Sequence, residues 1–136
     1  MADIEQALYT RLTGFAALAA LVSTRVTPMA LSQNLQDLPA FLDSVTYQKI
    51  SAPRLHSYGA DPGVVTARFQ TDSWARSYAK AKAVAVQVRA ALANQYGTTW
   101  SSVVIQNCRL ENEIDDMDTE TGIYRVTQDF TISYEE

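Results

Sequence analysis

The stretch SYAKAKAVAVQVRAALANQ, residues 77–95, decides the fold class of this chain. Its apolar residues recur at steps of three and four, which is the pattern of one face of an α-helix. Its many alanines favour a helix and also allow that helix to lie close against a sheet. Ser77 is suited to cap the first turn, and Gly97 follows where such a helix would end. The predicted apolar face consists of Tyr78, Ala81, Ala85, Val88 and Leu92.

Strand patterns lie on both sides of this helix. Apolar and polar side chains alternate in residues 44–51 and 64–74 before it, and in residues 103–110 and 123–134 after it. Residues 3–21 form a second helical pattern at the start of the chain. Consecutive strands pair as antiparallel hairpins, and amphipathic helices need a sheet face to cover. The sequence therefore predicts an α+β fold in the order α-β-β-α-β-β, with a four-stranded mainly antiparallel sheet covered by the long helix and the N-terminal helical segment.

The composition is that of one globular domain spanning residues 1–136. With 47% hydrophobic and 19% charged residues, and only 5 Gly and 4 Pro, the chain differs from disordered and low-complexity proteins. Cys108 is the single cysteine, so no disulfide can form within the chain. The longest apolar run, residues 14–22, is far shorter than the roughly twenty residues that span a bilayer. We therefore expect a protein made in the cytoplasm, with no membrane partner.

Charge is distributed unevenly along the chain. The formal net charge is −4, whereas a dedicated nucleic-acid-binding domain is usually basic. Residues 1–110 carry 10 basic and 6 acidic side chains, and residues 111–136 carry 9 acidic side chains and only Arg125. The first part therefore has a net charge of +4 and the second of −8. Such a chain can associate end to end with copies of itself. The alternative is that the acidic residues simply gather at a solvated turn and tail.

The sequence holds no recognisable catalytic, cofactor-binding or metal-binding motif. The single histidine, His56, lies in a turn-rich loop without a Gly-x-Ser-x-Gly nucleophile elbow elsewhere in the chain. Cys108 falls within a predicted strand, where a small packing residue is expected. Residues 115–120 are acidic but lack the Asp-x-Asp-x-Asp-Gly spacing of a calcium loop. We therefore expect no enzyme activity, no cofactor and no metal.

Six stretches, in their order along nearly the whole chain, carry a family resemblance. They are IEQALY (4–9), AALAALV (16–22), VTYQKIS (45–51), ARFQTDSWA (67–75), SYAKAKA (77–83) and GIYRVTQDF (122–130). Each alone is ordinary amphipathic sequence, and it is their order and spacing that matter. Taken together they resemble the tail-completion proteins of long-tailed bacteriophages and prophages, also called tail terminators or tail-to-head joining proteins.

The resemblance implies a structural role in the virion tail or neck, for a protein made in the cytoplasm of a bacterial host. Proteins of this kind form a homo-oligomeric ring, typically a hexamer, on the last ring of tail-tube protein. They stop tube growth and offer a surface to the head-tail connector or stopper protein. Phage DNA then passes through the lumen without sequence-specific binding, and an acidic lumen would repel its phosphates.

Two long connections are the candidate partner-binding segments on this hypothesis. Residues 53–62 join the first two predicted strands, and residues 113–122 join the last two. We expect both to be loops that order when they dock on neighbouring subunits. The candidate interface residues are Arg54, His56, Tyr58, Asp61, Asp115, Asp116, Met117, Asp118 and Glu120.

Two other readings of the sequence stay open. The first is another neck component, such as a head-completion or stopper protein, which shares the small size and the ring arrangement. The second is a small α+β module that binds a ligand or a partner between its helices and its sheet. Copurification with tails rather than with filled heads would distinguish a tail-completion protein from another neck component. A thermal stability that rises on addition of a ligand would favour the binding module.

Overall fold

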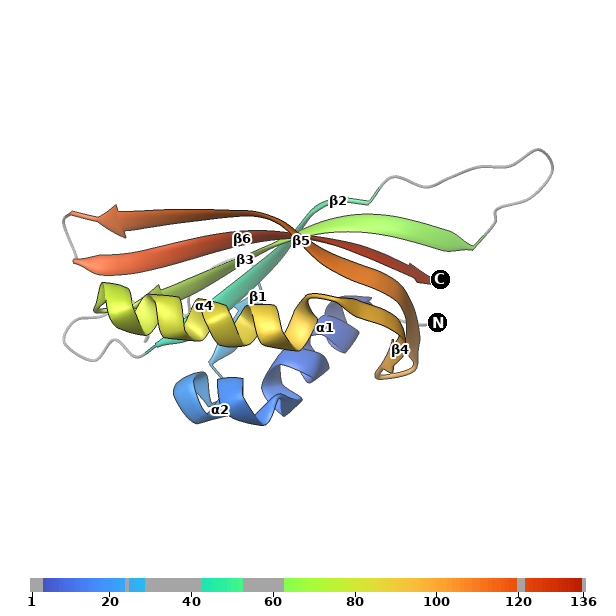
Figure 1. Ribbon diagram of the computed structural model, residues 1–136, viewed down its shortest axis with the longest axis horizontal. Coiled ribbons are helices and arrows are strands. Elements are labelled where there is room, and N and C mark those ends of the chain that lie inside the picture. Colours follow the sequence, from blue (N-terminus) through green and yellow to red (C-terminus); the bar gives the residue numbers. More distant parts are fainter. Residues whose placement is uncertain (1–3, 24, 29–42, 53–62, 120–121, 136) are drawn as a thin grey trace.

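The structure is a computed structural model that describes residues 4–23, 25–28, 43–52, 63–119 and 122–135. It has two layers, because the helices lie against the same face of a single sheet (Figure 1). The helices are α1 (Ile4–Gly14), α2 (Ala16–Val22) and α4 (Tyr78–Leu92). The strands are β1 (Val26–Pro28), β2 (Ser44–Ser51), β3 (Val64–Ala75), β4 (Gln95–Trp100), β5 (Val103–Asp118) and β6 (Ile123–Glu135).

The strands form one six-stranded sheet in the order β1-β2-β3-β6-β5-β4. β1 runs parallel to β2 and every other neighbouring pair is antiparallel, so the sheet is mixed. The prediction of a four-stranded mainly antiparallel sheet in the order α-β-β-α-β-β is therefore wrong. The four expected strands are present as β2, β3, β5 and β6 in the middle of the sheet, and two unexpected strands flank them.

The unexpected strands, β1 and β4, have weak sequence signals. β1 is three residues long and ends at Pro28, so it is too short to show an alternating pattern. β4 begins at Gln95, which the sequence placed in the long helix. That helix ends earlier, at Leu92, and Asn94 then adopts a positive φ of 59° that takes the chain back to the sheet.

The turn between β4 and β5 explains why this hairpin was missed. Trp100 pairs with Val103 across a two-residue turn, in which Ser101 and Ser102 have positive φ values of 45° and 70°. Two-residue hairpin turns with this backbone usually contain Asn-Gly or Asp-Gly. A Ser-Ser pair gives no comparable signal, so the hairpin could not be read from local sequence.

Helix α4 is formed and positioned largely as the sequence predicts. The Ser77 side chain accepts a hydrogen bond from the Lys80 backbone N–H at 3.2 Å, which confirms the N-cap. Tyr78 departs from the predicted apolar face, because 47% of it is exposed and it turns toward β5 instead. The buried residues of α4 are Ala81, Val84, Ala85, Val88, Ala91 and Leu92.

The core between helices and sheet has two parts. The larger part centres on Phe69 and Phe130, which are fully buried and opposite one another on β3 and β6. The smaller part, here called the alanine cluster, consists of Ala75, Ala81, Ala85 and Val126, with Tyr124 packed against it. The N-terminal half of α4 packs on the alanine cluster. This places α4 next to the second half of β5 (Figure 1).

Candidate functional site

The second half of β5, residues 109–118, has an open outer edge and is here called the β5 arm. β4 pairs with β5 only as far as Cys108, which is opposite Gln95. Beyond Cys108 the arm pairs with β6 alone, and no other strand of the described chain lies along its outer side. The structure thus places residues 113–118 in a strand, where the sequence predicted a loop.

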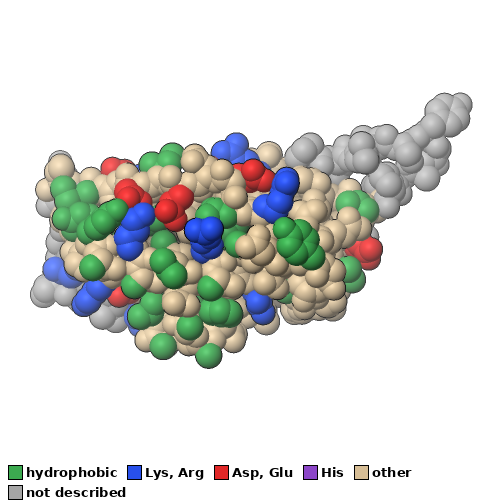
Figure 2. Space-filling view, in the orientation of Figure 1, with side chains coloured by type: hydrophobic (Ala, Val, Ile, Leu, Met, Phe, Trp, Pro, Cys, Tyr) green, Lys and Arg blue, Asp and Glu red, His purple; other side chains and the backbone are tan. Residues whose placement is uncertain are grey.

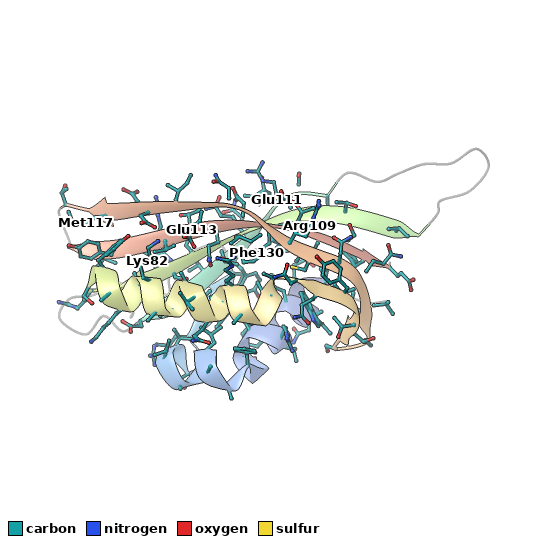
Figure 3. All side chains as sticks on the ribbon, viewed as in Figure 1. Lys82, Arg109, Glu111, Glu113, Met117 and Phe130 are labelled. Carbon is teal, nitrogen blue, oxygen red and sulfur yellow. The ribbon has the colours of Figure 1, made fainter. Side chains whose placement is uncertain are left out.

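On the helix side of the arm, two carboxylates meet α4. The Lys82 Nζ lies 2.9 Å from an oxygen of Asp115 and 3.3 Å from an oxygen of Glu113. The Tyr78 hydroxyl donates a hydrogen bond of 2.6 Å to the other carboxylate oxygen of Asp115. Figure 3 shows Lys82 on α4 beneath Glu113 on β5. Side chains one helical turn apart on α4 therefore hold the arm against the helix layer.

Gln128 joins this contact to the core. Its side chain is fully buried on β6 and donates hydrogen bonds to the Glu113 carboxylate at 2.9 Å and to the Ala85 carbonyl at 3.2 Å. Glu113 is therefore bound both by Lys82 and by Gln128. A buried amide fixed in this way restricts the positions that the arm can take relative to α4.

Asp115 and Lys82 both stay charged near neutral pH. Hydrogen bonds from Tyr78 and then from Lys82 lower the pKa of Asp115 below its usual value. Bonding to the Asp115 carboxylate raises the pKa of the Lys82 ammonium, against a smaller opposing effect of burial. Donation to the same carboxylate raises the pKa of the Tyr78 hydroxyl. The lowered pKa of Asp115 and the raised pKa of Lys82 keep both groups charged. This suits a structural contact and not a proton-transfer site.

The opposite side of the arm has its own ion pair. The Arg125 Nη2 lies 2.7 Å from one oxygen of Asp116, and the other oxygen accepts the Met117 backbone N–H at 2.8 Å. The Arg125 guanidinium also lies over the Trp74 ring, 5.4 Å from its centroid. These side chains and Ile123 line a surface pocket of about 280 Å³. The end of the arm is therefore ordered on both faces of the sheet.

Pairing compensates most of the acidic charge of the arm. Arg109 contacts Glu111 at 3.2 Å, so each of the arm's acidic residues whose side chain is described has a cationic partner. Figure 2 accordingly shows Lys or Arg side chains next to Asp or Glu side chains on the visible face. Two apolar side chains of the arm remain open to solvent, because Ile114 is 55% exposed and Met117 is 41% exposed. The arm is therefore a mixed surface of paired charges and exposed apolar groups.

The candidate interface residues fall into two groups. The structure brings Asp115, Asp116 and Met117 together in the β5 arm and places Asp118 at its end. The others, Arg54, His56, Tyr58, Asp61 and Glu120, lie outside the described residues.

Sequence reasoning missed four residues that hold the arm in place. Lys82 and Tyr78 lie four residues apart on α4, and this spacing alone marks them as neighbours on one helix face. Tyr78 was instead assigned to the apolar face. Arg125 and Gln128 lie on β6, where only the pairing of β6 with β5 reveals their role.

The described residues contain neither a cluster of metal ligands nor an activated cysteine. Within them, no three His, Cys, Asp or Glu side chains gather closely enough to hold a metal ion. Burial raises the pKa of the Cys108 thiol to about 12, which disfavours the reactive thiolate. No helix in the described ranges is both long enough and apolar enough to cross a membrane.

Comparisons with known proteins agree with this picture. A search of curated proteins finds no match. Among solved structures, a chain of the "Virion of native gene transfer agent (GTA) particle" matches with a TM-score of 0.77 and 21% sequence identity. The match covers 98% of this chain and 95% of that chain, and at this identity it shows a shared fold. The family model described as "Tail completion protein gp17" matches residues 6–135. The chain therefore belongs to the tail completion protein gp17 family, which confirms the resemblance seen in the sequence and makes it a structural component of a phage-type virion tail.

Proposed function

We propose that this protein caps the head-proximal end of a phage tail tube as a ring, stops tube polymerisation and joins the tail to the head connector. The observation that carries the proposal is the family match over residues 6–135. The surface of the described residues supports it, since it offers an ordered strand edge with exposed apolar groups. Such a surface suits contacts with other proteins.

The partners in this proposal are copies of the chain itself, the tail-tube protein and the connector or stopper protein of the head. A ring of about six copies is closed by heterologous contacts, in which one patch meets a different patch on the next copy. Phage DNA passes through the lumen without sequence-specific contacts. The overall net charge of −4 supports this, because a dedicated nucleic-acid-binding domain is usually basic.

The segments that engage these partners are residues 53–62 and the end of the β5–β6 hairpin. Arg54, His56, Tyr58 and Asp61 belong to the first segment. The second contains Asp115, Asp116, Met117, Asp118 and Glu120. We expect both segments to become protected from hydrogen exchange when the protein docks on the tail.

The experiment that tests the proposed function is the native mass of the purified protein across a concentration series, with negative-stain images of the same samples. The measurement is repeated after addition of isolated tail tubes. Closed rings in solution or on tube ends, with tubes of defined length, are the expected result. A stable dimer at every concentration, which leaves tube ends bare, would contradict the proposal. Copurification with filled heads and not with tails would identify another neck component.

A further inference from the structure

We infer that the open edge of the β5 arm pairs, main chain to main chain, with the open edge of β2 in a second copy of this chain. This inference rests on the proposed ring and specifies the contact that would close it. Each copy then has an acceptor edge, the β5 arm, and a donor edge, residues 48–51 of β2, which lie toward opposite sides of the same sheet.

The acceptor edge is the outer side of the β5 arm. Residues 109–118 pair with β6 on one side, and in the described chain no strand continues the sheet on the other. An edge strand directs the N–H and C=O groups of every second residue away from its sheet. A β-bulge lies between Leu110 and Asn112, so residues 112–118 form the regular part of this edge. A regular edge of this kind is a template for an added strand. Ile114, 55% exposed at the middle of the arm, provides an apolar contact beside the ladder.

The donor edge is the outer side of residues 48–51 in β2. β1 pairs only with Val45, Thr46 and Tyr47 of β2. Residues 48–51 therefore extend beyond β1, and no described strand lies on their outer side. Ile50 in this segment is 41% exposed, which matches the exposed Ile114 of the arm.

The charges on the two edges distinguish pairing of two β5 arms from pairing of β5 with β2. Two β5 arms placed together would bring Glu111, Glu113 and Asp115 of one copy close to the same residues of the other. Like charges opposite one another destabilise a sheet. The β2 edge has no acidic residue in positions 48–51, and its one cation, Lys49, already pairs with Glu5 of α1. Pairing of β5 with β2 therefore avoids the contact between like charges that pairing of two arms would create.

The two edges also determine the symmetry and the strength of the contact between copies. Because the two edges differ and lie toward opposite sides of the sheet, their pairing is head to tail and leaves each copy with one edge for each neighbour. A β-bulge between Lys49 and Ser51 interrupts the regular edge and keeps the ladder short. A short ladder is weak in an isolated pair of subunits. Closure of a ring combines several such contacts, so the ring is more stable than its fragments.

The test uses cysteine cross-linking between two single variants, Ile114→Cys and Ile50→Cys. Both positions are exposed, so neither substitution removes a core side chain. The native Cys108 is buried and does not compete for the reagent. The two full-length variants are mixed under conditions that form rings, in solution or on tail tubes, and treated with a short bis-maleimide. The matched control replaces Ile50→Cys with Val86→Cys, which is exposed on α4 and belongs to neither edge.

The expected result is a covalent dimer, twice the 15.0 kDa of one chain, in the mixture of Ile114→Cys and Ile50→Cys. The control mixture and each variant alone should stay monomeric on a denaturing gel. Rings that form without this cross-link, or a dimer from Ile114→Cys alone, would overturn the inference and leave the proposed function standing. If the unmodified protein forms no ring in either setting, the proposed function itself fails.

Discussion

The ammonium of Lys82 on α4 lies 2.9 Å from a carboxylate oxygen of Asp115 on β5, although the two residues are 33 positions apart in sequence. This contact fixes the end of the longest strand to the helix layer. The same carboxylate also accepts the Tyr78 hydroxyl, so two side chains of one helix hold one residue of the arm. The position of the open strand edge thus depends on a surface ion pair supported by hydrogen bonds.

Replacing Lys82 with Met should weaken the attachment of the arm. The ion pair is about one-third exposed, and pairs of this kind contribute roughly 0.2–1 kcal/mol to the free energy of unfolding. The longer-range effect should be faster hydrogen exchange of amides in residues 111–118. Urea denaturation and hydrogen exchange measure the two effects. Lys80→Met is the matched control, because Lys80 is exposed on the same helix and only its backbone N–H bonds to the cap. Equal losses in both variants would contradict the role given to Lys82.

Asp115 should titrate below the usual aspartate range, and its ionised form should stabilise the fold. Because its folded pKa is lowered, this contribution is present above the unfolded value of about 3.9 and is lost as the pH falls through the folded value. Tyr78→Phe removes the largest cause of the shift and should raise the pKa of Asp115. An NMR titration of the side-chain carboxyl carbon measures this. An unchanged pKa in Tyr78→Phe would show that the hydroxyl is not its main partner.

Much of the fold could be predicted from the sequence, because long periodic segments specify their own structure. The stripe of α4 and the alternation in β2, β3 and β6 were strong signals, and these elements form the centre of the molecule. The flanking strands could not be predicted in the same way. β1 is held by pairing with Val45, Thr46 and Tyr47, and β4 by pairing with β5, so both depend on tertiary contacts.

The candidate site was predicted in part. Asp115, Asp116 and Met117 were expected in a loop because Glu and Asp are uncommon in strands. In the fold, Lys82 and Arg125 pair with the carboxylates, and β6 pairs continuously with residues 112–118. The local preference is therefore overridden by partners that are distant in sequence. The family could be inferred because it rests on the order of many segments and not on one element.

Replacing Phe130 with Ala should cause the largest loss of stability among the changes considered. Phe130 is fully buried opposite Phe69, and truncation of a buried phenylalanine costs about 3–5 kcal/mol. The neighbouring Thr131 lies on the other face of the sheet and is only partly buried, so Thr131→Ala should cost about 1 kcal/mol or less. Chemical denaturation of both variants measures the difference. Similar values for the two would contradict the placement of the core on the helix side.

Cys108 should be unreactive toward thiol reagents until the protein unfolds. Cys108 lies on β5, the strand between β4 and β6, and its side chain is fully buried in the core. Burial raises the pKa of the thiol to about 12, so very little thiolate is present at pH 8. The native protein should therefore show almost no reaction with Ellman's reagent, whereas one thiol per chain should react in concentrated urea. Ile114→Cys serves as the internal comparison, because its exposed thiol should react at once while Cys108 in the same molecule does not. A second thiol that reacts equally fast in the native variant would show that the core around Cys108 opens readily in the folded protein.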